Sequence, residues 1–88
     1  MTTEQKMSAL AKSFPTLEDA PGVEPWDPAG LNRWASGPAP SSGARHAARF
    51  VLSVWNWNNR FDVHSAIRVW DDRHVAAFAA WALKPWYA

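Results

Sequence analysis

Histidines and aspartates are the residues of this chain that could perform acid–base or metal chemistry. Asp71 and His74 stand three residues apart, a spacing at which a carboxylate and an imidazole could reach one ion. A metal site needs three or four ligands, and the next histidine, His64, falls in a different predicted helix. We therefore expect no metal site and no cofactor, and we expect the aspartates Asp62, Asp71 and Asp72 to cap helices.

Asp62, His64 and Ser65 have the residue types of a hydrolytic triad. Neighbouring side chains on a helix point about 100° apart, so these three cannot easily form the linear relay that proton transfer requires. The sequence also lacks a nucleophile elbow, a phosphate-cradling glycine loop and a dinucleotide fingerprint. These observations predict a protein that is not an enzyme.

Arg45 and Arg49 lie one helical turn apart, and three more arginines follow before residue 74. Small helical bundles can place such a helix in a major groove, and aromatic rings can stack on unpaired bases. The formal net charge is only +1 and the pI is about 8.2, whereas nucleic-acid-binding domains usually carry a strong basic footprint. Nucleic-acid binding through Arg45 and Arg49 therefore remains the alternative function.

Seven tryptophans in 88 residues are the extreme feature of the composition. A chain this short can enclose only some of these indoles, so several tryptophans should reach the surface at least in part. Partly exposed tryptophan and arginine dominate the hot spots of protein interfaces. We predict a protein-binding surface formed by Trp34, Arg45, Arg49, Trp57, Trp81, Trp86 and Tyr87. The alternative for Trp34, Trp57 and Trp81 is the partial exposure that is normal for tryptophan, and Trp34 could serve only to cover a small core.

The ending KPWYA offers a second kind of anchor. Pro85 favours an extended backbone, and Trp86 with Tyr87 forms a compact amphipathic plug. Such a tail either docks on a partner or folds back on its own bundle.

These residues must be positioned by helices, because no hairpin signal or sustained strand alternation is present. Apolar residues recur at helical spacing from Met7 to Phe14 behind a threonine cap, which predicts a helix over 3–14. Asp27 before Pro28 predicts the start of a short helix near 28–36. Six of the seven prolines and all four glycines lie within 15–43, so the rest of that segment should be loop.

A central helix should follow Ser41 or Ser42, with one broad apolar face and a narrow polar stripe. Two further helices are expected behind Asp62 and behind Asp71 or Asp72. Their predicted core faces are Val63, Ala66, Ile67 and Trp70 in the first, and Val75, Phe78, Ala79, Ala82 and Leu83 in the second. The sequence thus predicts an all-α, single-domain bundle over 1–88, with four to five helices and a Pro/Gly-rich loop between the first helix and the central one.

Cysteine is absent, which excludes disulfides, thiolate nucleophiles and cysteine-based metal sites. The amino terminus is polar, unlike a secretory signal, and the longest apolar run, Val75 to Leu83, is far shorter than the roughly 20 residues of a bilayer span. We expect a cytoplasmic protein with no membrane partner.

Three segments, RFVLSVWN, RFDVHSAIRVWDD and AAFAAWALKPW, carry a resemblance to known sequences. Over about the last 45 residues the chain resembles small bacterial proteins from phage and integrative-element gene neighbourhoods, a group with no assigned activity. The resemblance implies a bacterial cytoplasmic setting and an accessory role on a mobile element, and it carries no functional residues.

Together these observations predict a non-enzymatic protein-interaction module that binds a protein partner or a second copy of itself. On the resemblance, the partner would be a host protein machine that the chain inhibits or modulates.

Overall fold

Five α-helices and one short 3₁₀ helix form the secondary structure of residues 1–56 and 58–88, which are the residues that the computed structural model describes. These residues contain no strand, so the all-α prediction is confirmed. The radius of gyration of 11.6 Å is close to the roughly 12 Å expected for a compact chain of this length. In chain order the elements are α1 (Thr3–Lys12), η1 (Pro15–Leu17), α2 (Pro28–Ser36), α3 (Ser42–Trp55), α4 (Val63–Val69) and α5 (Asp72–Leu83).

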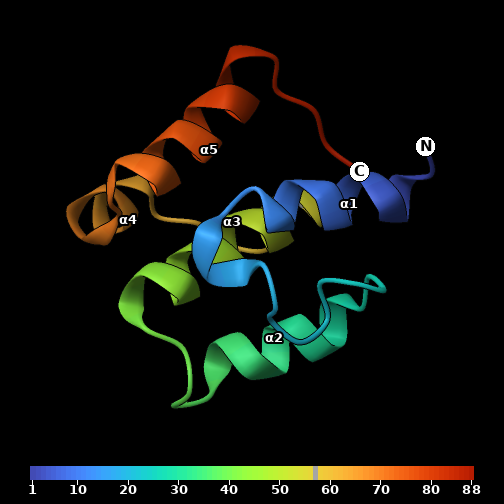
Figure 1. The fold of residues 1–88 in the computed structure, drawn as a ribbon, viewed down its shortest axis with the longest axis horizontal. Helices are drawn as coiled ribbons and strands as arrows, with labels where there is room; N and C mark the ends of the chain where they lie inside the picture. Colours follow the sequence, from blue (N-terminus) through green and yellow to red (C-terminus); the bar gives the residue numbers. More distant parts are fainter. Residues whose placement is uncertain (57) are drawn as a thin grey trace.

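Helix α3 lies at the centre of the arrangement and packs against α1, η1, α2 and α4 (Figure 1). In the view of Figure 1, helix α5 lies above α1 and α3. The tail that follows α5 returns toward α1, so that the two chain ends lie on the same side of the molecule (Figure 1). Helix α3 is largely apolar, so it is best placed at the centre, and seven of its residues are buried there.

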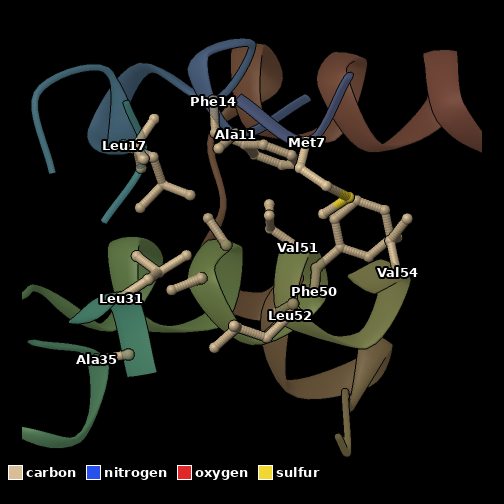
Figure 2. Close-up of a cluster of buried hydrophobic side chains, with 14 of the residues drawn as sticks. Met7, Ala11, Phe14, Leu17, Leu31, Ala35, Phe50, Val51, Leu52 and Val54 are labelled. Atoms are coloured by element: carbon tan, nitrogen blue, oxygen red, sulfur yellow. The ribbon is translucent and has the colours of Figure 1, made fainter. Parts of the chain in front are cut away.

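The core forms where the first segment of the chain meets the central helix (Figure 2). Met7, Ala11 and Phe14 come from α1 and the turn after it, and they face buried side chains of α3. Helix α2 contributes Leu31 and Ala35 to the same cluster. The fully buried large side chains of the core are Phe14, Phe50, Met7, Leu17, Leu31, Leu52, Val23, Val51 and Val54.

Each α-helix begins behind a side-chain cap that satisfies free backbone amides. The predicted caps are confirmed at Asp27, which accepts the Gly30 N–H, and at Ser41, which accepts the Ala44 N–H. Helix α1 starts with a reciprocal capping box between Thr2 and Gln5. Helices α4 and α5 start behind Asp62 and Asp71, as expected, whereas Asp72 is the first helical residue of α5.

The first helix is shorter than the predicted 3–14, because it ends at Lys12. Phe14 has an extended backbone (φ −91°, ψ 121°), the conformation that a following proline imposes. The turn still buries the Phe14 side chain, so the apolar periodicity identified the core residue correctly but extended the helix too far.

Gly22 makes the tight turn between η1 and α2 possible. Its φ is +83°, and its carbonyl oxygen accepts the Asp27 N–H at 2.7 Å. A Cβ at this position would lie 2.5 Å from both the Asp27 carbonyl oxygen and the Leu31 backbone nitrogen. The left-handed conformation and the close approach both require glycine here.

The predicted inner face of α4 is wrong for two of its members. Ala66 and Trp70 are buried, but Val63 and Ile67 are exposed, as is Val69. The helix has only seven residues, and its buried residue is the small Ala66, whereas the branched side chains of Val63 and Ile67 are exposed.

The predicted inner face of α5 is also partly wrong. Ala79, Ala82 and Leu83 are exposed, and the buried side is centred on His74, with Phe78 and Trp81 half-buried. Nearly every residue of α5 after its first turn is apolar, so hydrophobic periodicity could not select one face.

Aromatic side chains connect α5 to the core. The Phe50 ring of α3 lies 5.1 Å from Phe78 and 5.0 Å from Trp81, both edge-on. Phe61 and Trp70 stack at 5.8 Å beside this cluster, and the Trp70 indole donates to the Gly43 carbonyl oxygen at 3.0 Å. Helix α5 is therefore held by rings that reach across from its inner side.

Candidate functional site

An apolar groove lies between α1, α5 and the carboxyl-terminal tail, with a volume of about 370 Å³. Small side chains form much of its wall, so the groove is open between the two helices. Its volume is at the lower end of the range of roughly 300–1,000 Å³ that is typical of ligand sites. Its wall comprises Met1, Lys6, Ala9, Leu10, Ser13, Ala77, Ala80, Trp81 and Trp86, and we call this site the α1–α5 groove.

The two tryptophans of the α1–α5 groove are held in place by the returning tail. The Trp81 indole N–H donates to the Trp86 carbonyl oxygen at 2.9 Å. The Lys6 ammonium lies 4.4 Å from the centroid of the Trp86 ring, within the range of a cation–π contact. The Ala88 N–H donates to the Val54 carbonyl oxygen at 3.0 Å, which satisfies one of the free carbonyls at the end of α3. The tail thus folds back on its own bundle, one of the two arrangements that the sequence left open.

Large exposed apolar side chains lie at the end of α5 and on the tail. Leu83 is 84% exposed and Tyr87 is 62% exposed. The Tyr87 ring meets Trp81 edge-on at 5.6 Å, so the exposed aromatic surface is continuous with the wall of the groove. Lys6 is the one charged side chain of this wall, which makes the site apolar with a single cationic point.

The structure brings together three of the predicted site residues, namely Trp81, Trp86 and Tyr87. Trp34 lies elsewhere, half-buried against the core on α2. Trp57, which the sequence also assigned to the binding surface, lies outside the described residues.

Arg45 and Arg49 fasten α2 to α3. Arg45 donates to the carbonyl oxygens of Ala35 (3.1 Å) and Pro40 (3.3 Å). Arg49 donates to Asn32 Oδ1 (2.8 Å) and Ser36 Oγ (2.9 Å). All four acceptors are neutral, so both guanidinium groups are held in position while their charge is not offset by these partners.

The Asp62, His64 and Ser65 set forms a helix cap. Asp62 Oδ1 accepts the backbone N–H groups of His64 (3.0 Å) and Ser65 (3.3 Å), and Oδ2 accepts the Ser65 hydroxyl at 2.8 Å. The Ser65 hydroxyl and these amides hold the pKa of the Asp62 carboxyl below its ordinary value. Among the residues that the structure describes, no three His, Asp or Glu side chains are placed to hold a metal ion.

A carboxylate–imidazole–hydroxyl chain, which the sequence did not predict, joins α5 to η1. His74 Nδ1 lies 2.7 Å from Asp71 Oδ1, and His74 Nε2 lies 2.8 Å from Thr16 Oγ1. The bond to His74 lowers the pKa of the Asp71 carboxyl. The imidazole is only 4% exposed and stacks on Trp70, with the Phe14 ring 6.0 Å away. A substrate could not reach this imidazole without movement of its neighbours. We therefore assign a structural role to the hydrogen bonds that join Asp71, His74 and Thr16.

Sequence reasoning missed the residues that give the groove its shape. Lys6, Ala9 and Leu10 of α1 and Ala77 and Ala80 of α5 line it. Alanine carries no chemical signal in a sequence, and the pairing of α1 with α5 depends on contacts between segments about 70 residues apart. Only the dense aromatic content of the last helix and tail indicated a binding surface there.

A scan against models of known protein families finds no match to this chain. Searches of curated proteins and of solved structures find no significant match either. In the described part of the chain, no helix is both long and apolar enough to cross a membrane.

Proposed function

We propose that this chain is a non-enzymatic protein-interaction module, and that its α1–α5 groove receives an apolar segment of a protein partner. The observation that carries the proposal is the groove itself, whose apolar wall continues from Trp81 to the exposed ring of Tyr87. Tryptophan and tyrosine supply large contact areas at low conformational-entropy cost, which suits them to such a surface.

The single cation of the groove defines the partner further. Lys6 projects beside an aromatic face, so a segment with one or two large apolar side chains and a carboxylate beside them would fit. The proposal includes a cytoplasmic site of action, and the mobile-element resemblance adds a host protein as the class of partner.

The test uses two arginine substitutions on exposed positions of the same helix. Ala80→Arg places a long charged side chain in the groove, whereas Ala76→Arg places it on α5 outside the groove wall. Peptides selected from a random display library on the unaltered chain should bind the Ala76→Arg chain with unchanged affinity. They should bind the Ala80→Arg chain at least about tenfold more weakly, because a charge buried against an apolar peptide is costly. Equal binding by both variants contradicts the proposal.

Self-association is measured separately by light scattering on the same proteins. A dimer that Ala80→Arg dissociates and Ala76→Arg preserves would make a second copy the occupant of the groove. A monomer that selects no peptide would leave the groove without a binding role.

A further inference from the structure

A second cavity, of about 650 Å³, lies where α3 faces the segment that leads into α4. His46 and Arg49 of α3 form one side, and Asn59, Arg60 and Phe61 form the other, with Asp62 at the start of α4. This cavity shares no lining residue with the α1–α5 groove.

Positive charge exceeds negative charge in the wall of this cavity, which holds two arginines and one aspartate. Within residues 1–56 and 58–88, the hydrogen-bond partners of the Arg49 side chain are the neutral Asn32 and Ser36, which fix the guanidinium without neutralising it. Among the described residues, the ion pairs are Lys12 with Glu24 and His74 with Asp71, and neither involves this cavity. The chain has no acidic residue from Pro28 through Phe61, so every residue of the cavity wall before Asp62 is basic or neutral.

Asp62 is the one carboxylate in the cavity wall, and its oxygen atoms are already used. Both accept hydrogen bonds from the first turn of α4, as described above. The lowered pKa keeps this carboxyl ionised, so the wall carries two arginine charges against one aspartate charge.

The opposite part of the wall is aromatic. Phe61 packs on Phe50 with ring centroids 5.2 Å apart and stacks on Trp70 at 5.8 Å, so its position is fixed by the core. Asn59 uses its side-chain N–H groups on the carbonyl oxygens of Leu52 and Asn56, which holds the loop that carries Arg60. The cavity wall therefore includes two arginine side chains and an aromatic ring whose position is fixed by the core.

We propose that this cavity binds a phosphate monoester, with the phosphate held by Arg49 and Arg60 and its organic part against Phe61. Guanidinium groups bind phosphate oxygens through paired, charge-assisted hydrogen bonds. Two such groups bind a doubly charged monoester more tightly than they bind a singly charged ion. A nucleoside monophosphate and a phosphoserine side chain share this chemistry.

The experiment records ¹⁵N–¹H spectra of the full chain during titration with phosphoserine, adenosine monophosphate, inorganic phosphate, acetate and a single-stranded oligonucleotide. We expect saturable chemical-shift changes confined to residues around 46–49 and 59–63 with phosphoserine or adenosine monophosphate. The ligand that binds more tightly shows which organic group the cavity prefers beside the phosphate. Acetate should give no such shifts. Shifts of equal size with acetate, or tighter binding of the phosphodiester chain than of either monoester, would overturn the proposal.

Arg60→Gln is the decisive variant, because Arg60 is exposed and makes no hydrogen bond within the described residues. It should weaken phosphate-monoester binding at least about tenfold, the effect of one lost charge-assisted hydrogen bond. Arg68→Gln removes an equally exposed charge from α4, outside the cavity wall, and should leave the affinity within about twofold. Equal losses in the two variants would show a general charge effect and would reject the site.

Discussion

The Phe50 ring meets the Trp81 indole edge-on, with ring centroids 5.0 Å apart and planes at 77°, and this contact joins the central helix to the last one. Phe50 also contacts the rings of Phe14, Phe61 and Phe78. One buried side chain of α3 is thus shared by α5, by the turn after α1 and by the segment before α4.

Phe50→Ala should lower the free energy of unfolding by about 3–5 kcal/mol, because it opens a cavity at the point where these rings meet. Val69→Ala, on the exposed side of α4, is the matched control and should change stability by no more than about 0.5 kcal/mol. Urea unfolding followed by circular dichroism measures both. A loss below about 1 kcal/mol for Phe50→Ala would mean that the ring is not central to the core.

Gly22→Ala should destabilise the chain by about 1–3 kcal/mol, since alanine is strained at φ +83° and its Cβ would overlap the Asp27 carbonyl. Gly43→Ala provides the contrast, because a Cβ there meets only ordinary contacts at 3.7–3.8 Å within the first turn of α3. That substitution should be neutral or should stabilise by up to about 1 kcal/mol. The midpoint of thermal unfolding should fall for Gly22→Ala and should stay the same or rise for Gly43→Ala.

Asp71 should make the stability of the fold depend on pH in the acidic range. Its pKa is lowered in the folded chain by the bond to His74, so its contribution is complete above the ordinary aspartate pKa of about 4. The contribution is lost as the pH falls from that value through the lower folded-state pKa. Asp71→Asn keeps a capping side chain but should flatten the stability profile in this window.

Asp72→Asn is the control for that experiment, because it removes a neighbouring carboxylate that is not bonded to His74. Urea midpoints measured from neutral pH downward should keep the steep acidic dependence in this variant. If Asp72→Asn flattens the profile and Asp71→Asn does not, the assignment of the bond is wrong.

Arg49→Gln should loosen the attachment of α2 to α3. The loss of its bonds to Asn32 and Ser36 is expected to cost about 1 kcal/mol, less than for a buried pair because these contacts are exposed to solvent. In a double-mutant cycle, Ser36→Ala should cost much less in the Arg49→Gln background than in the unaltered chain. Arg33→Gln, on an exposed arginine of α2, serves as the charge control. Additive effects of Arg49→Gln and Ser36→Ala would show that the two side chains do not interact.

The helices and their starting points could be predicted from the sequence because their signals are local. A hydroxyl or carboxylate such as Ser41 or Asp71 acts on amides two or three residues away, and proline keeps the residue before it out of a helix. The broad apolar face of α3 was predictable for the same reason, since one helix alone displays it.

Which side of α4 and α5 faces inward depends on the rest of the fold. Ile67 has the stronger apolar character, yet Ala66 is fully buried and Ile67 is 45% exposed. The α1–α5 groove and the Thr16–His74 bond could not be predicted from the sequence either, since each joins residues more than 50 positions apart. No local pattern marks such pairs.

The bond from the Ala88 amide to the Val54 carbonyl has a consequence for hydrogen exchange. Amides at chain ends normally exchange with solvent almost at once, whereas this one should be retarded for as long as the tail stays docked. Its exchange rate therefore reports how often residues 84–88 detach while the bundle remains folded. Each such detachment removes Trp86 from the wall of the groove. A molecule bound in the groove should therefore slow hydrogen exchange at the Ala88 amide.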